Sequence, residues 1–163
     1  MINFNEQVLH LAELVRPSKQ KLTVAESCTG GWLAKVITDL NGSSDWFDRG
    51  FVTYSNESKI DMLGVSSSVL EQFGAVSIET VNAMALGALQ HSQADLSIAI
   101  SGIAGPSGGT DEKPVGTVCF AWAKSEAQSA KIIHAETIVF NGDRNSVREQ
   151  AVQFALDGII KLL

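Results

Sequence analysis

The chain has 163 residues, of which 45% are hydrophobic and 3 are proline, so it is long enough for one compact domain with a substantial core. Its 18 acidic and 12 basic residues give a net charge of -6, which excludes a broad positive surface for a nucleic-acid backbone. No apolar run approaches the roughly 18 residues that cross a bilayer, and the N-terminus has no signal-peptide core. We therefore expect one domain over residues 1–163 that is cytoplasmic and binds neither nucleic acid nor a membrane.

Hydrophobic periodicity and turn residues divide the chain into helices and strands. In chain order, the predicted elements are a helix over 5–20 that ends near Pro17, a strand over 21–25, a helix over 31–40, a loop over 41–46, a strand over 50–54, short helices over 55–63 and 66–73, a helix over 77–90, a strand over 95–100, a glycine-rich loop over 101–116, strands over 115–123 and 131–140, and a helix over 146–163. Helices that alternate with strands, with a hairpin near the end, predict an α/β fold: a layered α/β/α sandwich with a mixed sheet.

The turn after the first predicted strand, AESCTGGW, is the first candidate for chemistry. Helix N-termini expose unpaired backbone N–H groups and a partial positive charge, which suit an oxyanion or a phosphate. Thr29 is in position to cap the next helix, and Gly30 and Gly31 allow a ligand to approach the backbone closely. A capped helix, a phosphate site and a nucleophile that attacks a carbonyl all remain open for this turn.

A nucleophilic Ser27 needs a base, and the three histidines are poorly placed to supply it. His10 lies on the first helix, His91 ends a helix, and His134 lies inside a strand, so no histidine triad is visible. Lysine can replace histidine when burial lowers its pKa, because only the neutral amine accepts a proton. Lys59, in the segment TYSNESKIDML, is the candidate, and a surface lysine on a short helix is the alternative.

Two further residues near this site have more than one interpretation. Tyr54, the only tyrosine, ends the second predicted strand, where its hydroxyl can orient a substrate or its ring can simply pack. Cys28 competes with Ser27 as the nucleophile, because a thiol beside a helix N-terminus can ionise near neutral pH; otherwise it is a small buried residue. With Cys119 it forms neither a disulfide framework nor a zinc-ligand spacing, and we expect no metal.

Anion binding is also suggested at two other places. The loop over 101–116 contains 5 glycines, and long glycine-rich loops expose backbone N–H groups, although a disordered hairpin connection is the alternative. It does not contain the Walker A pattern. Arg144 and Arg148 lie four residues apart at the start of the last helix, where the helix dipole disfavours cations. A bound phosphate accounts for them, and so do solvated surface charges.

Three long blocks carry a resemblance to a known family. They read TVAESCTGGWLAKVITDLNGSSDWFDRGFVTYSNESK, SGIAGPSGGTDEKPVGTV and FNGDRNSVREQA. In these blocks, and in their order along nearly the whole chain, the sequence closely resembles the nicotinamide-nucleotide amidohydrolase family, the NMN deamidases also known as the CinA C-terminal domain. Full-length CinA proteins carry an additional N-terminal domain, so the resemblance implies the stand-alone form.

The resemblance implies hydrolysis of the carboxamide of nicotinamide mononucleotide (NMN) to nicotinic acid mononucleotide and ammonia. It makes Ser27 the nucleophile and Lys59 the base, and it places Tyr54 near the nicotinamide. We then expect the backbone N–H groups from Cys28 to Gly31 to hold the oxyanion. The phosphate is expected against either Arg144 or the glycine-rich loop, at Gly105, Gly108, Gly109 and Thr110.

No cofactor is implied, and a homodimer is expected. Exposed aromatic residues in the segment DWFDRGF also point to a dimer. Two other functions stay open at this point. One is a non-catalytic nucleotide-binding regulatory module, in which Ser27 is only a cap, and the other is a serine amidase of another small amide.

Overall fold

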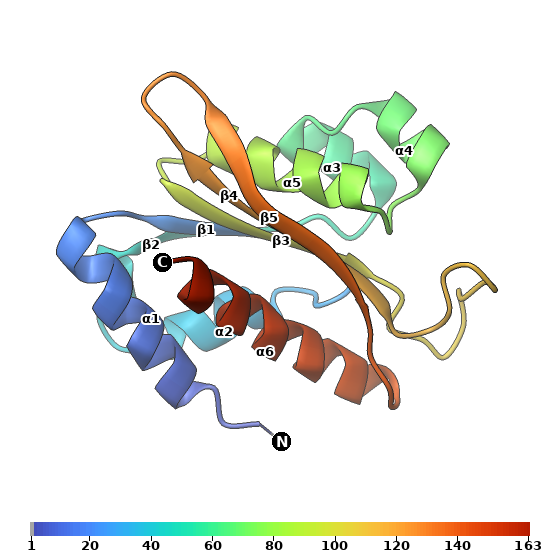
Figure 1. Cartoon of the computed structure of the whole chain (residues 1–163), viewed down its shortest axis with the longest axis horizontal. Helices are drawn as coiled ribbons and strands as arrows, with labels where there is room; N and C mark the ends of the chain where they lie inside the picture. Colours follow the sequence, from blue (N-terminus) through green and yellow to red (C-terminus); the bar gives the residue numbers. More distant parts are fainter. Residues whose placement is uncertain (1) are drawn as a thin grey trace.

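A five-stranded mixed sheet runs through the computed structural model, which describes residues 2–163 (Figure 1). Its strands are β1 (Leu22–Glu26), β2 (Phe47–Val52), β3 (Leu96–Gly102), β4 (Thr117–Ser125) and β5 (Ala130–Val139). The order across the sheet is β2-β1-β3-β4-β5. β1 is parallel to β2 and β3, whereas β4 is antiparallel to β3 and β5, so the hairpin predicted near the C-terminus is present.

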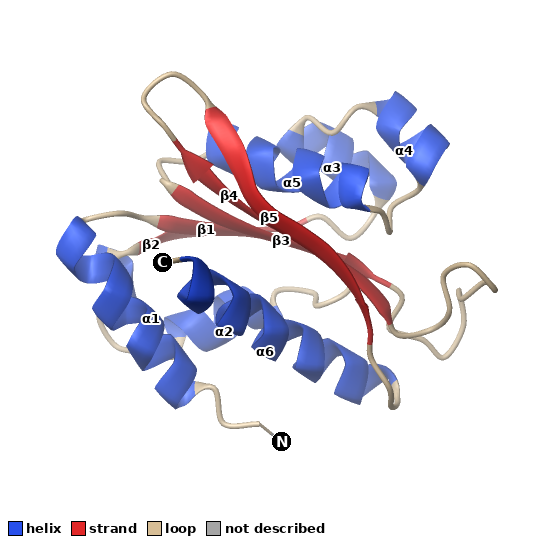
Figure 2. Ribbon diagram, in the orientation of Figure 1, coloured by secondary structure: helices blue, strands red, loops and turns tan. Residues whose placement is uncertain are grey.

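Helices cover both faces of this sheet (Figure 2). They are α1 (Asn5–Ser18), α2 (Trp32–Thr38), α3 (Asn56–Leu63), α4 (Ser67–Phe73), α5 (Ile78–Gln90) and α6 (Arg144–Leu162), with a short 3-10 helix at Ser43–Asp45. α1, α2 and α6 lie on one face, and α3, α4 and α5 lie on the other (Figure 1). The predicted α/β/α sandwich is therefore confirmed.

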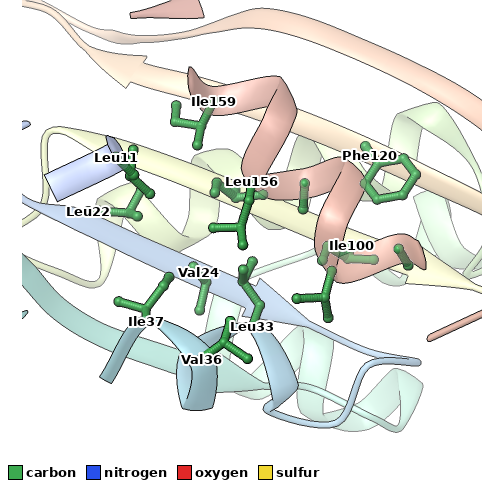
Figure 3. Close-up of a cluster of buried hydrophobic side chains, with 14 of the residues drawn as sticks. Leu11, Leu22, Val24, Leu33, Val36, Ile37, Ile100, Phe120, Leu156 and Ile159 are labelled. Atoms are coloured by element: carbon green, nitrogen blue, oxygen red, sulfur yellow. The ribbon is translucent and has the colours of Figure 1, made fainter. Parts of the chain in front are cut away.

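The core is divided by the sheet into two clusters, because successive residues of a strand point to opposite faces. In β1, Val24 packs into the cluster under α1, α2 and α6, and Ala25 packs into the cluster under α5. Figure 3 shows the first cluster, in which Leu33 of α2 and Leu156 of α6 meet over the sheet. Each fully buried leucine of this kind contributes about 1.5–3 kcal/mol. On the opposite face the strands present alanines, such as Ala99, so α5 packs close to the sheet.

Element bounds differ from the predicted ones mainly at the second strand. The prediction was 50–54, but β2 is Phe47–Val52, so Tyr54 follows the strand in the loop that leads to α3. The sequence pattern failed here because β2 is an edge strand and carries Asp48 and Arg49 in its first half, which hides the apolar signal. α2 is also shorter at both ends than the predicted 31–40.

The chain order of the strands creates a crevice at the end of β1. From β1 the chain passes through α2 to β2 on one side, and then through α3, α4 and α5 to β3 on the other side (Figure 1). The carboxyl ends of β1 and β3 lie side by side, with Glu26 opposite Ile100. In open α/β sheets such a switch in direction is where ligands bind. Ser27, the candidate nucleophile, directly follows Glu26, so the fold places it at this point.

Candidate active site

Ser27 occupies the first position after β1, and the sheet holds its backbone. Its N–H donates to the carbonyl of Ile100 at 3.0 Å, and on the other side the N–H of Thr53 donates to the carbonyl of Glu26 at 2.8 Å. The side chain of Ser27 is buried, with 8% of its surface exposed. Gly30 and Gly31 follow with φ angles of +61° and +92°, which glycine adopts without a steric penalty. The serine therefore sits on a fixed support at the mouth of the crevice.

Lys59 reaches Ser27 from α3. The helix begins after Ser55, whose side-chain hydroxyl accepts from the N–H of Ser58 at 3.0 Å and caps it. The ammonium of Lys59 is 3.0 Å from Ser27 Oγ, and it donates to the carbonyl of Thr53 at 2.7 Å. The surface-lysine alternative is excluded, because Lys59 is fully buried, with 0% exposure.

The environment of Lys59 favours its neutral form. Burial lowers the pKa of this lysine from 10.5 to about 8, because the buried ammonium loses its hydration. No ion pair within residues 2–163 includes Lys59, so no carboxylate opposes the effect of burial. At neutral pH a useful fraction of the amine is thus unprotonated and can accept the proton of the Ser27 hydroxyl.

A cavity of about 250 Å³ opens in front of this pair. Its walls come from the turn after β1, the loop before α3, the segment before α5, the end of β3 and the start of α6. The lining residues are Ser27, Cys28, Tyr54, Lys59, Ala75, Val76, Ser101, Gly102, Ala104 and Arg144. This volume is below the roughly 300–1,000 Å³ typical of pockets that enclose drug-sized ligands, so it can enclose only a small ligand or part of a larger one.

The glycine-rich loop contributes less to this cavity than the sequence suggested. Ser101, Gly102 and Ala104 line it, but the four residues expected to hold phosphate do not: Gly105, Gly108, Gly109 and Thr110. The loop is held by internal bonds, since the Thr110 N–H donates to the carbonyl of Lys113 at 2.8 Å. The loop is therefore not the disordered hairpin connection that was the alternative prediction.

A larger cavity of about 450 Å³ shares Val76 with the first one. Its ionisable residues include Glu79, Glu112 and Lys113, and the Lys113 ammonium donates to the carbonyl of Phe73 at 3.0 Å. It contains no hydroxyl within reach of a buried lysine. The smaller cavity is therefore the candidate active site, despite its size.

Arg144, the first residue of α6, lies at the rim of the smaller cavity. One of its nitrogens, Nη1, donates to the carbonyl of Gly105 at 2.8 Å, and Nη2 donates to the hydroxyl of Tyr54 at 3.2 Å. Tyr54 is 63% exposed, so it is not a packed core residue. The guanidinium thus joins the glycine-rich loop to the loop before α3 and presents a positive charge at the cavity wall.

Arg148 is one turn further along α6, and its position corrects the sequence interpretation. It does not line the cavity, and it is not a solvated surface charge. Its Nε donates to the carbonyl of Cys28 at 3.0 Å, and its Nη2 donates to the carbonyl of Thr29 at 3.0 Å. The guanidinium also lies over the ring of Trp32, 5.4 Å from its centroid. Carbonyl oxygens of the turn after β1 are its partners in this structure.

The capping of α2 also differs from the prediction. Thr29 is not the N-cap; Gly31 occupies that position and makes no side-chain cap bond. The buried carboxylate of Glu26 caps the helix instead. It accepts from the N–H groups of Gly31 at 3.2 Å, Leu33 at 3.1 Å and Ala34 at 2.9 Å. The sequence did offer one sign of this role, because Glu26 is an acidic residue at the end of a buried strand. Its hydrogen-bond partners are backbone N–H groups, however, and a sequence does not show which of these lie nearby.

These contacts narrow the set of expected oxyanion donors. The N–H of Gly31 is bound by Glu26, and that of Gly30 donates to the carbonyl of Ser27 at 3.1 Å. Within residues 2–163, the N–H groups of Cys28 and Thr29 donate to no acceptor in another residue. Of these two residues Cys28 lines the cavity, whereas Thr29 is fully buried and does not line it, so the N–H of Cys28 is the donor best placed for a ligand.

The thiol of Cys28 lies in an unreactive environment. Burial raises its pKa to about 12, so the reactive thiolate is scarce at neutral pH. This finding argues against the thiol alternative and for Ser27. The histidines do not line the cavity either. Within residues 2–163 no group of three potential metal-ligating side chains comes together, and no helix is long and apolar enough to span a bilayer.

The fold and the site together define a class of protein: a layered α/β domain with a buried serine–lysine pair at the switch point of its sheet. The family model described as the CinA C-terminal domain matches residues 5–163, and the chain belongs to this family.

Relatives in sequence carry the name of an amidohydrolase. Nicotinamide-nucleotide amidohydrolase PncC of Escherichia coli (strain K12) is 52% identical over 156 residues, which cover 96% of this chain and 90% of that protein. The protein of the same name from Pseudomonas putida is 47% identical over 93% of this chain and 92% of its own length. Among solved structures, a competence/damage inducible protein from Agrobacterium tumefaciens aligns with a TM-score of 0.91 and 42% identity, over 98% of this chain and 94% of that chain.

Proposed function

We propose that the chain hydrolyses the carboxamide of NMN to nicotinic acid mononucleotide and ammonia. Two independent lines support the proposal. Relatives about 50% identical over nearly the whole chain are named nicotinamide-nucleotide amidohydrolase. The observation that carries the mechanism is the 3.0 Å contact between the buried ammonium of Lys59 and the hydroxyl of Ser27.

In the first step, neutral Lys59 takes the proton of the Ser27 hydroxyl while Oγ attacks the carboxamide carbon. The C=O bond becomes a C–O⁻ oxyanion, and the N–H of Cys28, which lines the cavity, donates to it. The Lys59 ammonium that forms is stabilised by the carbonyl of Thr53. Because this carbonyl is already 2.7 Å from Nζ, the pair needs little rearrangement to hold the new charge.

Collapse of the tetrahedral intermediate breaks the C–N bond. Lys59 returns its proton to the departing nitrogen, which leaves as ammonia, and the acyl group stays on Ser27 as an ester. A water molecule then attacks the ester, with Lys59 again accepting a proton and returning it to Ser27 Oγ. The products are the carboxylic acid and the free serine. All atoms of the reaction come from the amide and water, so the proposed mechanism uses no cofactor.

The phosphate of NMN is assigned to Arg144 in this proposal. Its guanidinium is at the cavity rim, and a phosphate accepts well from its planar N–H groups. Tyr54, held by Arg144, lies where it can contact the nicotinamide ring. The alternative, phosphate binding by Gly105, Gly108, Gly109 and Thr110, loses support because none of them lines the cavity.

Ammonia release from a panel of amides tests this function. We expect release from NMN, and slower release from nicotinamide riboside, which lacks the phosphate. EDTA should leave the rate unchanged, because neither step uses a metal. Stoichiometric binding of NMN without ammonia would favour a nucleotide-binding module instead, and equal rates with and without the phosphate would favour a more general amidase.

Homodimer formation and a cytoplasmic location remain expectations. The aromatic residues of DWFDRGF no longer support a dimer, because Trp46 is fully buried and Phe47 and Phe51 pack against the two core clusters. Family resemblance is the remaining reason to expect one. Light scattering on the purified chain at micromolar concentration tests it directly.

A further inference from the structure

We propose that Ser101 recognises the amide nitrogen of the substrate and discriminates the amide from the carboxylic acid product. The proposal rests on the function proposed above, in which Ser27 attacks a carboxamide inside the cavity. Ser101 lies in β3, is 1% exposed, and lines this cavity together with Ser27 and Lys59. The proton transfers between Ser27 and Lys59 do not use it.

The sheet places Ser101 beside the nucleophile. β1 and β3 are parallel, with Ala25 opposite Ala99, and both alanines pack under α5. Two residues further along each chain segment, Ser27 and Ser101 therefore leave the sheet on this same face. The N–H of Ser27 still donates to the carbonyl of Ile100 at 3.0 Å, so the usual strand spacing of about 4.8 Å separates the two serines. α3, which carries the buried lysine, lies on the same face (Figure 1).

The hydroxyl hydrogen of Ser101 already has a partner, because it is donated to the carbonyl of Ala75 at 2.7 Å. Within residues 2–163 this carbonyl accepts from no other group. A serine hydroxyl has one hydrogen and two lone pairs. With the hydrogen directed at Ala75, the oxygen of Ser101 has only lone pairs left for a ligand, so it acts toward the ligand as an acceptor.

Other side-chain acceptors for an amide N–H are few in this cavity. Among the lining residues, the side chains with an oxygen atom are those of Ser27, Tyr54 and Ser101. Ser27 is the nucleophile, and Tyr54 is exposed and holds its hydroxyl against Arg144. In the part of the chain that the structure describes, no carboxylate and no side-chain amide lines the cavity. An N–H group buried beside Ser27 therefore has Ser101 as its side-chain acceptor.

A donor on one side and an acceptor on the other fix the orientation of the carboxamide. The N–H of Cys28 donates to the carbonyl oxygen, and Ser101 accepts from the NH₂ group. The carboxylate product has two acceptor oxygens, so one of them meets the lone pairs of Ser101. Relief of this contact requires the hydroxyl hydrogen to leave the carbonyl of Ala75, which then loses its partner. The site therefore binds the amide more tightly than the acid, which favours release of the product.

The experiment measures the dissociation constants of NMN and nicotinic acid mononucleotide by calorimetry at neutral pH. Ser27→Ala is the background, to prevent turnover, and Ser101→Ala is added to it. Loss of one neutral hydrogen bond should weaken NMN binding about fivefold, whereas the acid should bind as tightly as before or more tightly. The dissociation constant of the acid divided by that of NMN should therefore fall about fivefold or more. A general loss of structure would weaken both ligands and leave this ratio unchanged.

Ser97→Ala is the matched control. Ser97 lies four residues earlier in β3, is fully buried, and donates its hydroxyl to the carbonyl of Ala85 at 2.8 Å, but it does not line the cavity. It should leave the ratio unchanged. In the chain with Ser27 intact, Ser101→Ala should lower kcat/KM for NMN about fivefold or more, and Ser97→Ala should not. If Ser101→Ala does not fold, Ser101→Cys, whose sulfur is a weak acceptor, gives the same test.

An unchanged ratio in folded Ser101→Ala or Ser101→Cys overturns the proposal. An equal fall of the ratio in Ser97→Ala also overturns it, since the effect would then not depend on the cavity. If wild type releases ammonia from NMN and the ratio does not change, only this inference fails. If wild type releases no ammonia but the ratio falls in Ser101→Ala, only the proposed function fails. A chain that binds neither ligand removes both.

Discussion

Raising the pH from 7 to 9 should increase kcat/KM for NMN about tenfold, because the fraction of neutral Lys59 rises from about 9% to about 91% when the pKa is about 8. This ratio is the appropriate constant, since it reports the pKa of the free enzyme, and the free enzyme is the state that the structure describes. Burial is the cause of the shift. At its ordinary pKa of 10.5, the same lysine would be neutral in only about 0.03% of molecules at pH 7.

The assay is initial-rate ammonia release at low NMN concentration, in buffers of constant ionic strength. Measurements start at pH 7, because the phosphate of NMN titrates near pH 6 and would distort the lower limb. The logarithm of kcat/KM should rise with a slope near one and level off above about pH 8. A rate that does not change between pH 7 and 9.5, or a midpoint near 10.5, would refute the assignment of buried Lys59 as the base.

Substitutions at three residues give further predictions. Lys59→Arg should be nearly as inactive as Lys59→Ala in the ammonia assay, since a guanidinium cannot accept the proton; substantial turnover would reduce Lys59 to an electrostatic role. In the unfolded chain Lys59 binds a proton up to pH 10.5, but in the folded chain only up to about 8, so wild type gains stability between these values. The free energy of unfolding of Lys59→Met, relative to wild type in urea, should therefore fall by about 3 kcal/mol from pH 7 to 11; a constant difference would contradict the pKa. Cys28→Ala should keep most activity, and wild type should resist iodoacetamide at pH 7, because burial raises the pKa of this thiol to about 12. Arg144→Ala should raise KM more than it lowers kcat, and an unchanged KM would place the phosphate elsewhere.

The order of helices and strands was predictable because it depends on local hydrophobic spacing. α1, with Val8, Leu11 and Val15 buried on one face, illustrates this. Pro17 does not end the helix, which runs through it to Ser18 and stops where Lys19 adopts a left-handed φ of +56°. The edge strand β2 was placed too late, since half of its residues face water and carry no apolar pattern.

The candidate site was predictable only in part. The turn at Ser27 could be identified from its small polar residues and glycines. The contact with Lys59, 32 residues away, depends on how α3 packs, and local spacing favoured a solvated lysine. The carboxylate of Glu26 and the guanidinium of Arg148 act on backbone groups, which carry no residue identity. Such contacts appear only when the chain has folded.

The role of Ser27 as the nucleophile is tested most directly by ammonia release from NMN in wild type and Ser27→Ala, measured side by side with NMN binding. We expect steady turnover in wild type. In Ser27→Ala we expect intact binding and almost no ammonia, because the nucleophile is lost while the cavity walls remain. Ammonia release by Ser27→Ala at a rate close to that of wild type would contradict the serine mechanism, because the hydrolysis would then proceed without the serine.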